Sequence, residues 1–126
     1  MNSLLYKNEC YNIQGAIYKV YHNLGSGFLE SVYQECLGIE FTNLNIPYKA
    51  QYGINISYNG EIISQKYRAD FVCYDKIIIE IKAVKETNDI QIAQLINYLK
   101  ATGMKLGLLV NFGSHPKVEI NRYIMD

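Results

Sequence analysis

Charged side chains interrupt an apolar, β-branched run at residues 77–82, where the sequence reads Ile-Ile-Ile-Glu-Ile-Lys. Side chains alternate between the two faces of a strand, so Ile78, Glu80 and Lys82 are expected to share one face. Burying two opposite charges on an apolar strand is costly unless the charges are paired or bind something. The run is therefore either an exposed strand end with solvated charges or part of a binding or catalytic site.

Asp70 favours the second interpretation. If the turn before this strand centres on Asp75, residues equally far from Asp75 pair across the hairpin, and Asp70 then faces Glu80. Two facing carboxylates repel unless a cation lies between them, and such a pair is the hard oxygen site that Mg²⁺ prefers. Lys82 would then stand near an attacking water or a charged oxygen. The alternative is a structural salt-bridge cluster of Asp70, Glu80 and Lys82.

The elements that must position these residues follow from the periodicity of apolar residues. Helical spacing predicts one helix over residues 4–24 and a second over about 29–41, separated by Gly25-Ser26-Gly27. Strand patterning begins at Tyr48, with a hairpin turn at Asn59-Gly60 and one or two strand segments over residues 61–74. The later elements expected are a helix from Thr87-Asn88-Asp89 to Ala101 that stops at Gly103, a buried strand over residues 106–111, and a last strand or turn over residues 118–124.

This element order predicts an α/β fold, with a mixed sheet of four to five strands flanked by helices. The chain has 126 residues, of which 49% are apolar, and its formal net charge is zero. These values predict one compact domain over residues 1–126 and exclude disorder as the main state. The longest apolar stretches are far short of the roughly 20 residues of a membrane span. The first residues lack the pattern of a secretory signal, so we expect a cytoplasmic protein.

The three cysteines are odd in number and share no short spacing, so we expect them to be reduced and mostly buried. The balanced charge gives no bulk indication of nucleic acid.

Three motifs in this sequence resemble a known group of proteins. Asp70…Glu80-Ile81-Lys82, with its strand-turn-strand context, resembles the metal site of the PD-(D/E)xK nuclease superfamily, although Ala69 stands where the superfamily name has proline. The segment Gly27-Phe28-Leu29-Glu30-Ser31-Val32-Tyr33 resembles the signature of the GxxExxY family within that superfamily. Gln94-Leu95-Ile96-Asn97-Tyr98 resembles the Gln-x-x-x-Tyr motif of its RecB-like branch. The resemblance extends over about residues 9–124.

The resemblance implies a restriction-endonuclease-like core and a nuclease that cuts DNA phosphodiesters with a water activated by Mg²⁺ or Mn²⁺. It implies that Asp70, Glu80 and the backbone carbonyl of Ile81 are metal ligands. It also implies that Glu30 reaches the metal as a third acidic ligand or through water, and that Lys82 stands by the attacking water. Without the resemblance, Glu30 would be a solvated carboxylate near a helix N-terminus.

Gln94 and Tyr98 are four residues apart, so they project together from a helix. The same resemblance implies that they line the site. Taken alone, they read as a polar edge and a half-buried core aromatic residue. Residues expected to contact nucleic acid are Arg68, Lys100 and Tyr33. A second hypothesis is a nuclease-fold module that binds DNA or protein with little or no catalysis, because a nuclease usually has a basic groove and this chain has no net charge. The small size predicts a homodimer or a helper protein.

Overall fold

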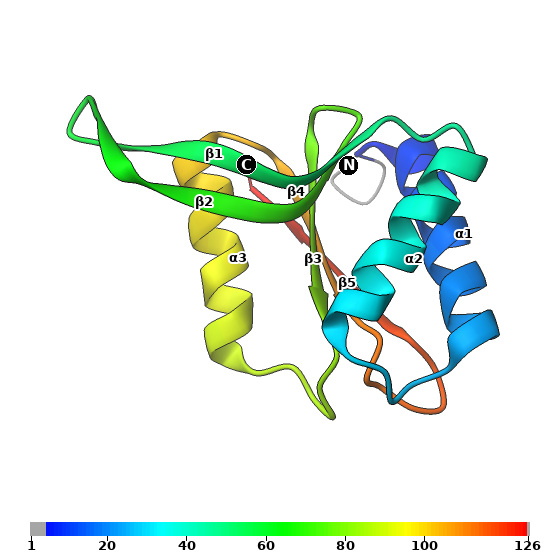
Figure 1. The fold of residues 1–126 in the computed structure, drawn as a ribbon. Coiled ribbons are helices and arrows are strands. Elements are labelled where there is room, and N and C mark those ends of the chain that lie inside the picture. The colour runs from blue at the N-terminus through cyan, green and yellow to red at the C-terminus, as the bar shows by residue number, and fades with distance from the viewer. Residues whose placement is uncertain (1–4, 126) are drawn as a thin grey trace.

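The computed structural model describes residues 5–125, which form three helices and a five-stranded sheet (Figure 1). The strands lie in the order β1-β2-β3-β4-β5, and β3 and β4 are parallel while the other neighbours are antiparallel. Helices α1 and α2 cover one face of the sheet and α3 covers the other. The mixed sheet flanked by helices is the predicted fold class. Its elements are α1 (Lys7–Leu24), α2 (Glu30–Asn43), β1 (Tyr48–Tyr58), β2 (Glu61–Cys73), β3 (Ile77–Lys82), α3 (Asp89–Thr102), β4 (Leu106–Asn111) and β5 (Glu119–Ile124).

Local sequence signals account for most ends of these elements. Asn88 caps α3, because its side chain accepts a hydrogen bond from the Gln91 backbone N–H at 2.8 Å while Gln91 accepts one from the Asn88 N–H at 3.1 Å. Gly103 ends the helix in the left-handed conformation. Asn59 and Gly60 both have positive φ, as a two-residue hairpin requires.

The structure shifts one predicted boundary and resolves two alternatives that the sequence left open. The first helix begins at Lys7, after Tyr6 in the left-handed region, and residue 4 lies outside the described residues. Residues 61–73 form a single strand, and the last segment is the strand β5. None of these differences moves the predicted site.

β3 is the central strand of the core and is buried on both faces. Ile77, Ile79 and Ile81 pack with residues of α1 and α2, whereas Ile78 packs with residues of α3. This is the alternation expected of a strand. Glu80 is two residues after Ile78, so its side chain lies on the same face, toward α3. Cys10 and Cys73 are buried, Cys36 is half-buried, and all three are free thiols.

The β1–β2 hairpin extends beyond the body of the sheet. The pairing of β2 with β3 ends at Phe71 and Ile79, but β2 stays paired with β1 as far as the hairpin turn. The resulting two-stranded ribbon passes α3 and projects past it (Figure 1). β2 and β3 therefore separate immediately beyond Phe71, at Asp70.

The end of β3 is tied to β4 beyond the last strand pair. Phe112 N–H donates to the Lys82 carbonyl at 2.8 Å, and the buried Asn111 side chain bonds both backbone groups of Val84. The same Asn111 oxygen accepts the Gly113 N–H at 3.0 Å. A Cβ on Gly113 would lie 2.3 Å from the Val84 carbonyl oxygen, so this approach requires glycine.

Within residues 5–125, no helix is both long and apolar enough to cross a membrane.

Candidate active site

Asp70 lies where β2 leaves β3. The pairs Phe71–Ile79, Val72–Ile78 and Cys73–Ile77 are centred on Asp75, so the predicted hairpin register is confirmed. Asp70 comes next on β2, and its Oδ2 accepts a hydrogen bond from the Ile81 N–H at 2.7 Å. Because β2 and β3 are no longer paired at this point, the Ile81 N–H has no backbone acceptor on β2. The Asp70 carboxylate accepts its hydrogen bond instead. Where the strands separate, this half-buried carboxylate is held in place by the backbone of β3.

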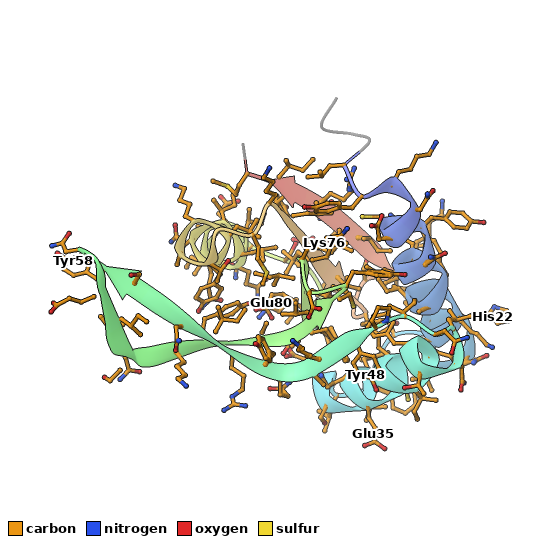
Figure 2. The ribbon with its side chains drawn as sticks, turned by 90° about the horizontal axis from the view of Figure 1, so that it is seen from above. His22, Glu35, Tyr48, Tyr58, Lys76 and Glu80 are labelled. Atoms are coloured by element: carbon orange, nitrogen blue, oxygen red, sulfur yellow. The ribbon has the colours of Figure 1, made fainter. Side chains whose placement is uncertain are left out.

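Glu80 is half-buried between the ribbon and the sheet (Figure 2). Burial raises the pKa of its carboxyl to about 7, a rise that the Glu30 charge reinforces, while Lys82 and a hydrogen bond from the Asp70 backbone act in the opposite direction. The hydroxyl of Tyr67 donates a hydrogen bond to Glu80 Oε1. The interpretation of this segment as an exposed strand end with solvated charges is therefore wrong.

Four charged side chains influence one another at this site. Burial raises the pKa of Asp70, which the hydrogen bond from Ile81 and the charge of Lys82 oppose. Partial desolvation also raises the pKa of Glu30, although the residue is largely exposed; Lys82 opposes this rise and Asp70 adds to it. These mutual effects place Asp70, Glu80 and Lys82 close enough to influence one another, and Glu30 influences the site from the start of α2.

A structural salt-bridge cluster does not account for this arrangement. Within residues 5–125, none of the direct ion pairs involves Asp70, Glu80 or Lys82. Lys82 is half-buried and acts on the carboxylates from beyond ion-pair distance. Carboxylates that are desolvated and lack a close cation are destabilising unless they bind a ligand.

The site offers a pair of carboxylates to a metal, with Glu30 nearby. Across the described part of the chain, no three Asp, Glu, His or Cys side chains are arranged to hold one ion together. Glu30 is exposed at the first residue of α2, so the structure does not place it with Asp70 and Glu80 in a three-residue ligand group. Mg²⁺ is commonly bound by one or two carboxylates and keeps several waters, so the donor set fits this ion.

Helix α3 contacts the site indirectly, through the packing of Tyr98 on Tyr67. The Tyr98 ring stacks on the Tyr67 ring, with centroids 3.5 Å apart, and Tyr67 bonds Glu80. Gln94 lies one turn earlier and is exposed. Lys100 is exposed in the last turn, about 200° around the helix axis from Tyr98, and the structure does not bring it to the site.

Two predicted nucleic-acid contacts have different surroundings. Arg68 is exposed on β2, where its NH1 donates to the Gln51 carbonyl at 2.9 Å. Tyr33 is fully buried, which is incompatible with the expected contact to nucleic acid. Its hydroxyl donates to the Gly25 carbonyl at 2.5 Å, and its ring stacks on Phe112 at 4.5 Å. Tyr33 thus fixes the loop before α2 and so positions Glu30.

Sequence reasoning missed three residues that hold Asp70 and Glu80, two through the carboxylates and one through the Asp70 backbone. Tyr67 bonds Glu80; Gln34 donates to the Asp70 carbonyl at 3.1 Å; and Gln51 donates to Asp70 Oδ1 at 3.4 Å. Gln34 lies one helical turn after Glu30, a spacing that could have identified it. Gln51 has a positive φ of 49°, which is uncommon outside glycine and gives no signal in the sequence.

Replacing Tyr67 with phenylalanine is expected to weaken metal binding at pH 7 by about tenfold. It should also raise the pH at which metal binding reaches half of its maximum. The change keeps the ring stacked on Tyr98 but removes a hydrogen bond to the charged form of Glu80, which favours protonation. Groups that orient metal ligands typically contribute 10- to 100-fold to affinity, which is about the size expected. Mg²⁺ titrations monitored by thermal melting from pH 6 to 9 measure both effects. Tyr58→Phe at the exposed hairpin tip is the control, and equal midpoints in all three proteins would contradict the assignment.

The comparisons with known proteins agree with this geometry. The family model described as PD-(D/E)XK nuclease superfamily matches residues 7–123, which include every residue of the site. The chain belongs to this superfamily. A search of curated proteins gave no match.

Among solved structures, the crystal structure of SSO0001 is similar to this PD-(D/E)XK chain, with a TM-score of 0.57 and 21% sequence identity. The match covers 76% of this chain and 50% of that chain, so this PD-(D/E)XK chain spans about half the length of SSO0001. At this identity the likeness concerns the fold alone.

Proposed function

We propose that this PD-(D/E)XK protein is a divalent-metal-dependent nuclease that hydrolyses DNA phosphodiester bonds, and that it is a GxxExxY protein of the RecB-like branch. The observation that carries the proposal is the meeting of Asp70 and Glu80 where β2 and β3 separate. Both carboxylates are held by neutral donors, and the nearest cationic side chain of the site does not pair with them directly. This arrangement leaves negative charge available for a cation.

In the proposed site, Asp70, Glu80 and the Ile81 carbonyl hold Mg²⁺ or Mn²⁺, and Glu30 acts through water. When bound, such an ion neutralises charge on the phosphate and increases the acidity of a bound water. Lys82 orients or deprotonates the attacking water, or offsets charge on the phosphate. Gln94 and Tyr98 line the site, and Arg68 contacts the backbone phosphates. The residues thus favour in-line attack on a phosphate held beside the carboxylates.

The second candidate is a module that keeps the fold and binds DNA or protein without cleaving it. The zero net charge favours it, because nucleic-acid affinity depends strongly on Lys and Arg contacts to phosphate. It also fits the proposal that this single domain works with a second copy or a helper protein. Cleavage assays with Mg²⁺ on DNA and RNA substrates separate the two candidates.

The first test is a thermal melt of the protein in EDTA, Mg²⁺ or Mn²⁺. An ion that binds only the folded state at one hundred times its Kd stabilises the protein by about 2.7 kcal/mol, which raises Tm by roughly 10 °C at this size. We expect this shift in the wild type and not in the double variant Asp70→Ala, Glu80→Ala. The double variant Glu61→Ala, Asp75→Ala removes two exposed carboxylates from the same hairpins and should keep the shift. A wild type that does not respond at millimolar ion would remove the main support for a metal-dependent enzyme.

A further inference from the structure

A groove of about 550 Å³ lies between α2 and β1. Gln34 and Gln51 line it; Gln34 donates to the Asp70 backbone carbonyl at 3.1 Å and Gln51 to Asp70 Oδ1 at 3.4 Å. Two other residues that line it, Glu35 and Tyr48, are labelled beside α2 and β1 in Figure 2. Two residues that line the groove thus also hold the backbone and side chain of a proposed metal ligand.

One face of α2 connects the site to the groove. Glu30, Gln34, Gly38 and Thr42 are spaced four residues apart, so they follow one another along the same side of the helix. Glu30 belongs to the charged site, and the other three line the groove. Gly38 leaves the middle of the groove open, because a Cβ there would lie 3.6 Å from Tyr48 Oη.

The chemistry of the groove suits a flat, uncharged group. The half-buried ring of Tyr48 forms part of its wall, with the fully buried Phe71 ring beneath it. The side-chain amides of Gln34, Asn43 and Gln51 add donors and acceptors. The residues that line it include Glu35 but neither Lys nor Arg, which disfavours a phosphate in the groove. Nucleobases combine π faces that stack on aromatic rings with edges that amides can hydrogen-bond.

We propose that this groove binds an unpaired base of the substrate strand, adjacent to the phosphate that is cleaved. The proposal rests on the proposed function, because a base is joined to its phosphate through one sugar and two residues that line the groove bond Asp70. A base inside a duplex cannot enter such a groove without being unpaired and unstacked, which costs a few kcal/mol. The substrate is therefore single-stranded DNA or a frayed DNA end.

Two helix glycines provide a matched pair of variants. Gly38→Leu fills the groove, and Gly15→Leu makes the same change on α1, where a Cβ meets no atom within 4 Å. Gly38→Ala adds only a methyl group at ordinary contact distance and serves as a second, milder variant if Gly38→Leu does not fold. Far-ultraviolet circular dichroism and thermal melts establish that each variant is folded.

The decisive measurement uses deoxyadenosine, an uncharged nucleoside, and needs no catalysis. In the metal-free protein we expect two-dimensional ¹⁵N NMR spectra to shift at the side-chain amides of Gln34 and Gln51 and at the backbone of α2. Gly38→Leu should weaken this binding at least about tenfold, as expected when base stacking is lost, whereas Gly15→Leu should leave it unchanged. Gly38→Leu should also raise KM for single-stranded DNA about tenfold with kcat retained.

The outcomes separate this proposal from the nuclease function. If Mg²⁺ raises Tm but deoxyadenosine shifts no residue of the groove, the base site is wrong and the metal site stands. If deoxyadenosine binds but neither Mg²⁺ nor Mn²⁺ changes Tm, the base site stands without the proposed nuclease. If gel filtration shows a wild-type dimer that Gly38→Leu dissociates, the occupant is a second copy of the chain and the proposal is overturned.

Discussion

Glu80→Gln is expected to stabilise the metal-free protein at pH 8 by up to about 3 kcal/mol. The pKa of Glu80 is raised from 4.5 to about 7 in the folded protein, chiefly by burial. Between these two values the folded state keeps a proton that the unfolded chain has lost, so stability falls as pH rises through this window. Each unit of pKa difference corresponds to about 1.4 kcal/mol, which sets the upper limit. Glutamine keeps an acceptor for the Tyr67 hydroxyl and removes the charge.

Urea denaturation in EDTA at pH 4.5 and pH 8 measures this effect. The wild type should lose stability between the two pH values, and the Glu80→Gln protein should lose less. Adding Mg²⁺ at pH 8 should reverse the order, because only the wild type keeps the ionised carboxylate that binds the ion. Glu61→Gln, at the exposed start of β2, is the matched control and should follow the wild type in both conditions. Identical pH dependence in the wild type and Glu80→Gln would show that Glu80 is not desolvated in the folded protein.

Asp70→Asn is expected to lower Mg²⁺ affinity by more than about 100-fold and to abolish cleavage at sub-millimolar Mg²⁺. Losing groups that only orient a metal ligand already costs about 10- to 100-fold, so losing a charged ligand should cost more. The fold should persist, because asparagine retains an oxygen that can accept the Ile81 N–H. Single-turnover cleavage over a range of Mg²⁺ concentrations measures the apparent Mg²⁺ affinity and the cleavage rate. The Tm in EDTA shows whether the variant is folded.

Asp75→Asn is the control for this change, since Asp75 is an exposed aspartate in the turn that joins β2 and β3. It should cleave as the wild type does. Unchanged cleavage in Asp70→Asn would remove Asp70 from the mechanism. Absence of cleavage in every protein, with DNA binding retained, would favour the binding module instead.

The fold could be predicted from the sequence largely because its signals are local. The Asn59-Gly60 turn, the Asn88 cap and the Gly103 stop each determine a boundary through a few backbone dihedrals and hydrogen bonds. The alternation of residues 77–82 identified the charged face of β3, and the turn at Asp75 set the register that brings Asp70 to Glu80. These inferences needed only spacing along one chain.

The parts that could not be predicted depend on where strands separate. Nothing in the local sequence indicates that β2 leaves β3 at Asp70 while it remains paired with β1, because that depends on how the ribbon packs over α3. Gln51 is a contact of this kind, since a left-handed residue opposite Asp70 has no marker in its residue type. Tyr33 shows the converse, because a residue that belongs to a recognisable motif proved to be buried and structural.

Asn111 has a consequence for how this protein can change. Its side-chain amide hydrogen-bonds both the N–H and the carbonyl of Val84. These bonds continue the connection between β3 and β4 for two residues beyond their last strand pair, Lys82–Asn111. The start of the loop that leads to α3 is therefore held in place at Val84. A change in the length of this loop should not shift the strand that carries Glu80 and Lys82. The exposed residues Lys85 and Glu86, which precede the cap of α3, are consequently a place where the chain can accept an inserted segment beside the site.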